Sequence, residues 1–147
     1  MSYLEIKLQA KKLYSKIGRV SCPAFGGDFV SFNRLGFSHL LRKGHIPRPK
    51  SEQKRRLSLL KYAEVIVKNP KAKIYFRQIE AKYLINRHGQ KILTASLVKF
   101  WTFIEEIDGK KIKLVIRQLG NGNKHFLSIM ERRHKNVLAI SKRADRD

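Results

Sequence analysis

The stretch that decides the fold runs from Val98 to Arg132 and reads VKFWTFIEEIDGKKIKLVIRQLGNGNKHFLSIMER. It holds three apolar-rich runs separated by the dipeptides Asp108-Gly109 and Asn121-Gly122. Both dipeptides tolerate the positive φ angles of a tight type I′ turn, and runs of this length and composition are typical of strands. The stretch therefore predicts three consecutive antiparallel strands, which cover residues 98–107, 111–119 and 124 onwards.

Counting outward from two-residue turns predicts which side chains share a face of this sheet. One predicted face is apolar and forms the core: Trp101, Phe103, Leu114, Ile116, Leu127 and Ile129. The other face mixes basic groups, hydroxyls and aromatic rings: Phe100, Thr102, Lys113, Val115, Arg117, Phe126, Ser128 and Arg132. That second face suits a polyanion better than a core. A longer loop or a β-bulge would break this alternation.

The net charge is the dominant feature of the composition. The 147 residues include 33 Lys and Arg but only 11 Asp and Glu, which gives a formal charge of +22. Hydrophobic residues make up 42% of the chain, enough to form a core. Such an excess of basic groups attracts polyanions, and nucleic acid is the commonest of them. RNA is therefore the expected partner, with an acidic protein or an anionic membrane as alternatives.

Several classes of site and location are not expected. The single cysteine, Cys22, excludes an internal disulfide framework, and no Cys/His spacing resembles a zinc site. We therefore expect no metal and no cofactor. The chain holds no apolar run of ~18 residues and no signal-peptide profile at its start. These absences predict no membrane span and a cytoplasmic site of action, and they leave secretion by a specialised system open.

The order of predicted elements gives the fold class and the domain limits. We expect a basic amphipathic segment at 1–20, one folded domain at 21–134 and a polar tail at 135–147. Helices are predicted at 2–17, 34–43 and 52–68, with Asn33 and Ser51 as the caps of the second and third. Residues 45–50 contain two prolines and are predicted to be a linker between the second and third helices. An edge strand follows at 72–83. The prediction is an α+β fold, with N-terminal helices on one face of a four- to five-stranded antiparallel sheet and the other face open.

The sequence lacks the common signatures of metal or phosphate-loop chemistry. It has no Gly-rich phosphate loop, no GxSxG, no HExxH and no paired carboxylates on a predicted strand. The remaining functional groups are His, Arg, Lys and Ser. Cleavage of RNA without a metal needs a base for the 2′-hydroxyl, cations for the phosphorane and an acid for the leaving 5′-oxygen. Those four residue types can supply all three roles.

The candidate catalytic residues are His39, Arg117, Ser128 and His125. Arg117 is the expected phosphate clamp, because a planar guanidinium matches phosphate oxygens. His39 is the expected base or acid, with His125 as the second choice, and Ser128 would orient phosphate. Each has an ordinary structural alternative: a core-edge histidine, a solvated strand arginine, and a serine that fills a cross-strand slot. Expected substrate-binding residues carry only positive charge: Lys43, Arg55, Arg56, Lys113 and Arg132.

Four segments together resemble a known family. They are Val30-Ser31-Phe32-Asn33 followed by Gly36-Phe37-Ser38-His39-Leu40, the helix that ends at Asn69-Pro70, Ile116-Arg117, and His125-Phe126-Leu127-Ser128-Ile129. In their order they resemble the phage branch of the barnase, EndoU, colicin and RelE-like nuclease superfamily, over roughly residues 22–133. The resemblance implies a metal-independent RNA-cleaving domain, used as a toxin or an effector. His39, Arg117 and Ser128 occupy the matching positions.

Three functions compete on the sequence. The first is a metal-independent endoribonuclease of toxin or effector type, with an acidic antitoxin or immunity protein as a further partner. The second is a non-catalytic RNA- or ribosome-binding module that uses the same basic sheet face. The third is a domain that binds an acidic protein.

Overall fold

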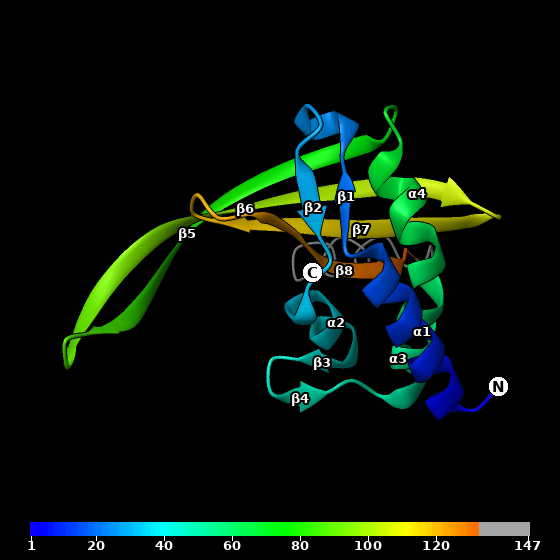
Figure 1. Cartoon of the computed structure of the whole chain (residues 1–147), viewed down its shortest axis with the longest axis horizontal. Helices are drawn as coiled ribbons and strands as arrows, with labels where there is room; N and C mark the ends of the chain where they lie inside the picture. Colours follow the sequence, from blue (N-terminus) through cyan, green and yellow to red (C-terminus); the bar gives the residue numbers. More distant parts are fainter. Residues whose placement is uncertain (133–147) are drawn as a thin grey trace.

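Four antiparallel strands form a meander in the C-terminal half of the chain. A computed structural model describes residues 1–132 and places in this meander β5 (Lys73–Arg87), β6 (Gln90–Ile107), β7 (Lys110–Leu119) and β8 (Lys124–Glu131) (Figure 1). The turn at Asp108-Gly109 lies where the sequence predicts it, and both residues have positive φ. The second turn follows Leu119, but its positive φ is at Gly120 and not at Asn121-Gly122, so the predicted two-residue turn there is wrong. The predicted tail, residues 135–147, lies outside the described residues.

Two short strands from the N-terminal half complete the sheet. β1 (Arg19–Ser21) and β2 (Phe29–Ser31) extend it to six strands in the order β1-β2-β8-β7-β6-β5. β2 runs parallel to β8, with Val30 opposite Lys124 and Ser31 opposite His125. The predicted four- to five-stranded antiparallel sheet is therefore wrong, because the sheet has six strands and is mixed. The parallel contact joins segments from opposite ends of the chain, and no local sequence pattern records such a pairing.

The helices begin and end largely at recognisable signals. They are α1 (Tyr3–Ile17), α2 (Arg34–Leu41), α3 (Lys50–Leu59) and α4 (Ala63–Lys68), with 3-10 turns η1 (Pro23–Phe25) and η2 (Leu60–Tyr62). The Asn33 side chain caps α2 as predicted, accepting from the Gly36 amide. The single helix predicted at 52–68 is wrong, since η2 divides it into α3 and α4. No helix within residues 1–132 combines the length and apolarity needed to cross a membrane.

A second, two-stranded sheet follows α2 where the sequence suggested only a linker. β3 (Arg42–Lys43) pairs with β4 (Ile46–Pro47) around Gly44, whose φ of +64° is readily available to glycine. This small hairpin leads the chain from α2 back towards the start of α3 (Figure 1).

The core lies between the helices and one face of the sheet. Its largest fully buried side chains come from both layers: Phe103, Ile112, Leu114, Ile116, Phe126, Ile129, Leu40, Leu60 and Ile66. Tyr14 of α1 packs its ring against Phe32, Phe37 and Phe126. On α1 itself Ala10 and Tyr14 are buried, whereas Leu4 and Leu8 of the expected apolar stripe are exposed.

A β-bulge in β8 changes the predicted faces. The predicted register holds at Leu114–Ile129 and Val115–Ser128, but a register shift follows, and Arg117 then lies opposite His125. The shift leaves Leu127 as the extra residue of the bulge. Phe126 consequently faces the core instead of the second face, and His125 joins Arg117 on the second face.

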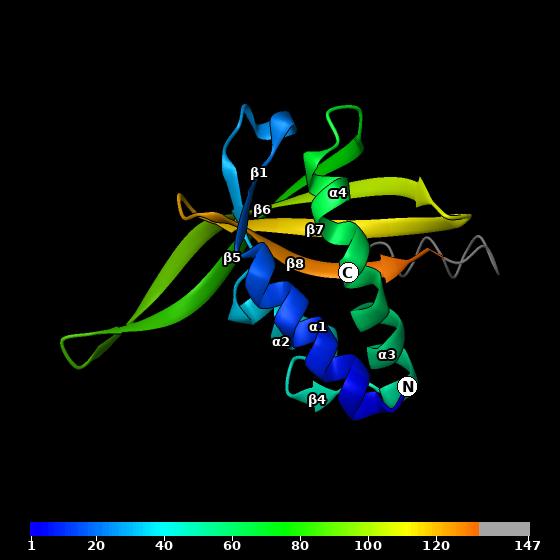
Figure 2. The same cartoon turned by 45° about the vertical axis from the view of Figure 1, so that its right-hand side comes forward.

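The sequence predicted that the second face of the sheet is open. Along β7 this prediction is wrong. Lys113 and Val115 are both buried there, and so is Val98 of β6. α3 also reaches beyond the core face, because Arg56 donates to Ser128, which lies opposite Val115 of the second face. β2 pairs only with the first residues of β8, and α2 continues along the edge that β2 leaves free (Figures 1 and 2).

The hairpin of β5 and β6 extends well beyond the rest of the sheet. β7 ends at Leu119, which lies opposite Val98 of β6. Directly after β7, the Gly120 amide donates a hydrogen bond to the Leu97 carbonyl of β6 at 2.8 Å. From there the two strands pair with each other as far as Arg87 and Gln90. We call residues 80–97 the arm. It points away from the helices in both views (Figures 1 and 2).

Candidate active site at the edge of β8

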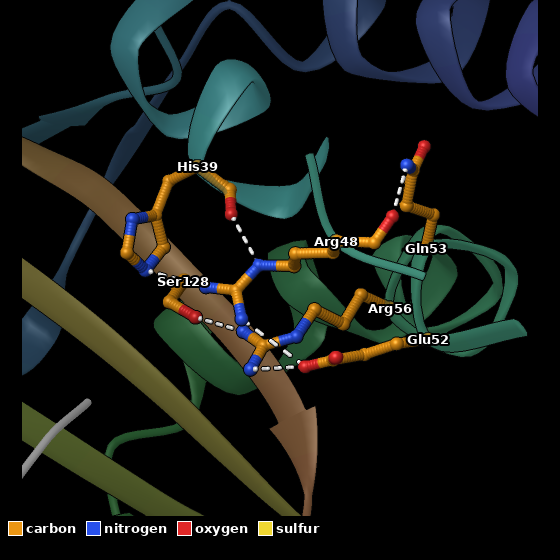
Figure 3. Close-up of polar contacts among 6 residues, drawn as sticks. All are labelled: His39, Arg48, Glu52, Gln53, Arg56 and Ser128. Atoms are coloured by element: carbon orange, nitrogen blue, oxygen red, sulfur yellow. Dashed lines mark hydrogen bonds and ion pairs between the residues drawn. The ribbon is translucent and has the colours of Figure 1, made fainter. Parts of the chain in front are cut away.

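A cluster of polar side chains joins α2, α3 and β8 at the edge of the sheet (Figure 3). We call it the arginine cluster, and its members are His39, Arg48, Glu52, Arg56 and Ser128. It brings together two predicted catalytic residues, His39 and Ser128, with Arg56, which was predicted only to bind substrate. Arg48 and Glu52 were not predicted.

The position of His39 depends on the close approach of α2 to β8. A Cβ atom on Gly36 would lie 2.3 Å from the Phe126 carbonyl oxygen and 2.7 Å from the Tyr14 hydroxyl. Only glycine fits this space without a shift. The Tyr14 hydroxyl also donates to the Asn33 carbonyl at 2.6 Å, which ties α1 to the start of α2. His39 follows Gly36 by about one helical turn and therefore lies at the same sheet edge.

Arg48 contacts both the backbone carbonyl and the ring of His39. Its Nε donates to the His39 carbonyl at 2.9 Å, and a terminal nitrogen lies 3.3 Å from His39 Nε2. A guanidinium can only donate, so Nε2 must accept this bond. The accepting nitrogen carries no proton, and the His39 ring in this arrangement is neutral.

One carboxylate oxygen bridges the two arginines. Glu52 Oε1 lies 3.1 Å from a terminal nitrogen of Arg48 and 3.3 Å from one of Arg56. Arg56 also donates to the Ser128 hydroxyl at 2.8 Å. Both arginines are nearly inaccessible, at 6% exposed for Arg48 and 4% for Arg56. Burial of this kind fixes the guanidinium groups in place before any ligand arrives.

The spacing of these three residues is a signal that the sequence reading missed. Arg48, Glu52 and Arg56 are four residues apart, which places them on one side of a helix and the turn before it. Pro47 and Pro49 flank Arg48 and favoured its interpretation as part of a linker. Gln53 supports the same turn, because its side-chain amide donates to the Arg48 carbonyl at 2.7 Å.

The other two predicted catalytic residues form a separate pair on the second face of the sheet. Arg117 Nε donates to His125 Nε2 at 3.0 Å. Burial lowers the pKa of His125 below its ordinary value, and the nearby charge of Arg117 lowers it further. Burial also lowers the pKa of Arg117. His125 is therefore neutral at pH 7, and its Nε2 accepts from an arginine, as His39 Nε2 does.

The predicted substrate-binding residues are not gathered in one place. Lys43 on β3 and Arg55 on α3 are exposed, whereas Lys113 on β7 is buried. Arg132 follows β8 and is half-buried, and its amide donates to the Lys111 carbonyl at 2.7 Å. Of the five predicted substrate-binding residues, only Lys43 and Arg55 are exposed.

The arginine cluster offers the groups that phosphate chemistry requires. Two guanidinium groups can donate to phosphate oxygens, an imidazole nitrogen can accept a proton, and a hydroxyl lies within the same network. Within residues 1–132, no three His, Cys, Asp or Glu side chains gather in the manner of a metal site.

Two of the four segments that carry the family resemblance lie side by side in the structure. β2 holds Val30 and runs beside β8, which holds residues 125–129, while α2 holds His39 and packs on β8. The resemblance itself stays a prediction. The chain matches no protein-family model, and no curated protein or solved structure matches it significantly.

Proposed function

We propose that this protein is an endoribonuclease that cleaves RNA without a metal ion, by attack of a 2′-hydroxyl on the adjacent phosphodiester. The observation that carries the proposal is the arginine cluster, in which Arg48 and Arg56 lie beside His39 and Ser128. The net charge of +22 supports a polyanionic substrate.

In this mechanism Arg48 and Arg56 bind the scissile phosphate. Burial holds both guanidinium groups in place, and preorganised donors of this kind stabilise the charge that develops on a phosphorane. The bond between Arg48 and His39 Nε2 is long at 3.3 Å, so an incoming phosphate competes for that donor. Its loss leaves the Nε2 lone pair available.

His39 then moves the proton. Nε2 accepts the 2′-hydroxyl proton as that oxygen attacks phosphorus, and the 5′-oxygen bond breaks. The attacking 2′-oxygen and the leaving 5′-oxygen lie on opposite sides of phosphorus, so the 5′-oxygen takes its proton from solvent water, and the imidazolium of His39 later returns its proton to solvent. The products are a 2′,3′-cyclic phosphate and a 5′-hydroxyl end. Ser128 does not react, but it positions Arg56 through their hydrogen bond.

The test is cleavage of RNA by the purified full chain in the presence of EDTA. We expect cyclic phosphate ends, and no cleavage of a substrate whose scissile nucleotide lacks the 2′-hydroxyl. His39→Ala should slow cleavage by ~10²–10⁴-fold, as expected for a general base. Arg48→Lys, which keeps the charge but loses the planar fork, should slow it by ~10-fold or more. Arg55→Ala is the matched control on α3, since Arg55 is exposed.

Variants of the pair Arg117 and His125 show which of the two sites cleaves RNA. If His125→Ala abolishes cleavage and His39→Ala does not, the active residues are Arg117 and His125 and the proposed site is wrong. If RNA stays intact with every preparation of the folded protein, the enzyme proposal fails altogether.

A non-catalytic RNA- or ribosome-binding module is the second candidate. The observation that favours it is the near-complete burial of Arg48 and Arg56, whose contacts within the protein also suit a purely structural network. Exposed basic side chains on the N-terminal helices would then bind the phosphates: Lys11, Lys12, Lys16 and Arg55. Tight binding with intact RNA is the result that favours this function.

The proposed setting is a toxin or effector that acts on RNA in the cytoplasm. The resemblance to the phage branch of the nuclease superfamily supports it, as does the basic charge. An acidic antitoxin or immunity protein would be the natural inhibitor of such an enzyme.

A further inference from the structure

The arm, residues 80–97, is a two-stranded ribbon with both of its edges free. Within the described part of the chain, β5 lies at the end of the sheet, and β6 has no neighbour other than β5 beyond Leu97. Free edges expose unpaired backbone N–H and C=O groups that readily accept another strand. The arm carries neither proline nor a bulge that would prevent such an addition.

One face of the arm carries an apolar pair at its centre. Leu84 lies directly opposite Leu93, and both are strongly exposed, at 64% and 66%. On the same face, Lys82 lies two residues before Leu84 along β5, and Lys91 lies two residues before Leu93 along β6. The result is a small apolar patch framed by two lysines.

The apolar and basic side chains of this patch indicate which kind of partner would bind to it. Exposed apolar side chains with a polar rim mark protein interaction sites, whereas nucleic-acid interfaces are mainly polar. A second copy of the chain would bring +22 against +22 and two lysines against two lysines. An acidic protein would bring the opposite charge to the lysines and to the whole molecule.

We propose that the arm is the docking site of an acidic protein partner. The partner adds a strand to the free edge of β5, its apolar side chains pack on Leu84 and Leu93, and its carboxylates meet Lys82 and Lys91. Main-chain bonds supply affinity in this mode of recognition, and alternating side chains supply specificity. The proposal does not depend on ribonuclease activity.

The probe is a short synthetic peptide designed to form a strand. Threonine occupies every second position, and the positions between them carry glutamate, leucine, leucine and glutamate in that order. The control peptide has serine in place of both leucines and therefore the same charge. Binding of each labelled peptide to the full chain is measured by fluorescence anisotropy. Hydrogen exchange then reports which backbone amides become protected.

We expect the probe to bind, to protect amides of β5 in the arm, and to bind the protein at least ~10-fold more tightly than the control peptide does. Leu84→Ser with Leu93→Ser should abolish this preference. The matched double variant Tyr83→Ser with Ile92→Ser removes exposed apolar side chains from the opposite face and should keep it. Both variants should fold, because the arm projects from the sheet (Figure 1).

Four results would overturn the proposal. The first is that the probe fails to bind. The second is that the Leu84→Ser, Leu93→Ser variant binds the probe as well as the native chain does, which would indicate charge attraction alone. A native dimer that this variant dissociates in sedimentation would assign the arm to a second copy. Duplex RNA or anionic phosphatidylglycerol vesicles that bind through Leu84 and Leu93 would assign the arm to those surfaces.

Discussion

Two neighbouring arginines on α3 show how burial separates a site residue from a surface charge. Arg55 is exposed, whereas Arg56 is 4% exposed and contacts both Glu52 and Ser128. In the sequence they are adjacent and chemically identical, and both were expected only to bind substrate. The difference arises from tertiary packing of α3 on β8, which no pattern in the residues around them specifies.

Arg56→Ala should lower the free energy of unfolding by about 2 kcal/mol or more, because Ser128 loses a buried donor and the network loses a charge. Arg55→Ala should change it by less than about 0.5 kcal/mol. Urea denaturation, followed by circular dichroism, measures both. Equal effects of the two substitutions would show that Arg56 is not part of a buried network.

His125 should make the stability of the protein depend on pH. Its pKa in the folded state lies below the ordinary 6.5, so the unfolded chain takes up a proton first as the pH falls. The free energy of unfolding should therefore decrease as the pH drops from about 6.5 towards the folded pKa, by at most about 1.4 kcal/mol per pH unit, and stay constant above that window.

The matched variant for this effect is His125→Gln, which keeps a polar group beside Arg117 but does not titrate. Denaturation at about pH 7.5 and about pH 5 should show a smaller loss of stability for the variant than for the native chain. A native chain and variant with the same pH dependence would contradict the lowered pKa of His125.

At the scale of single residues, the sequence predicted His39 and Ser128 within one cluster but not their partners. Arg48 was missed because its flanking prolines suggest a linker. Phe126 was assigned to the wrong face, because the second turn is not the predicted two-residue turn and the register between it and the bulge in β8 differs by one residue. A bulge leaves no mark that counting from a turn can detect.

Among the elements, the contact between α2 and β8 is the most sensitive to substitution. Gly36→Ala would usually stabilise a helix by about 1 kcal/mol, yet here the added Cβ meets the Phe126 carbonyl oxygen at 2.3 Å. We expect a net destabilisation of about 1–3 kcal/mol, as for other overpacked sites. Because α2 must shift, RNA cleavage should fall as well.

Ser38→Ala is the control for this substitution, since Ser38 is an exposed residue of the same helix. It should leave both stability and cleavage nearly unchanged. Thermal unfolding of the two variants provides the measurement, and a Gly36→Ala protein more stable than the native chain would refute the close packing of α2 on β8.

Some local signals predicted their elements correctly, but Ser51 lies inside α3 and is not its cap, and elements defined by distant contacts were not predicted. Asp108-Gly109 set the register of β6 and β7 correctly, and Asn33 marked the start of α2. In contrast, β1 is a three-residue strand and β2 joins the sheet through β8, so neither the strand count nor the mixed character followed from the sequence. The break at η2 also went unrecognised, because its residues fit a continuous helix.

For the whole molecule, the excess of basic residues should dominate the affinity for RNA. Each phosphate neutralised by Lys or Arg releases counterions, so the logarithm of the association constant should fall linearly with the logarithm of the salt concentration. Filter binding of a non-cleavable RNA between about 50 and about 200 mM salt measures the slope. Removing exposed charges with Lys11→Ala and Lys12→Ala tests whether α1 contributes, in which case the slope becomes shallower. An affinity that does not change with salt would argue against phosphate contacts as the main source of binding.

The parallel pairing of β2 with β8 has a consequence for the nascent chain. The N-terminal helices and β2 leave the ribosome first, but the strand that β2 pairs with and α2 packs on is the last one made. Contacts so distant in sequence form late and slowly. His39 therefore meets Ser128 only after synthesis has passed β8, and a prematurely terminated chain has no complete arginine cluster. Under the proposed function, cleavage of RNA therefore cannot begin before β8 has been made and has reached α2.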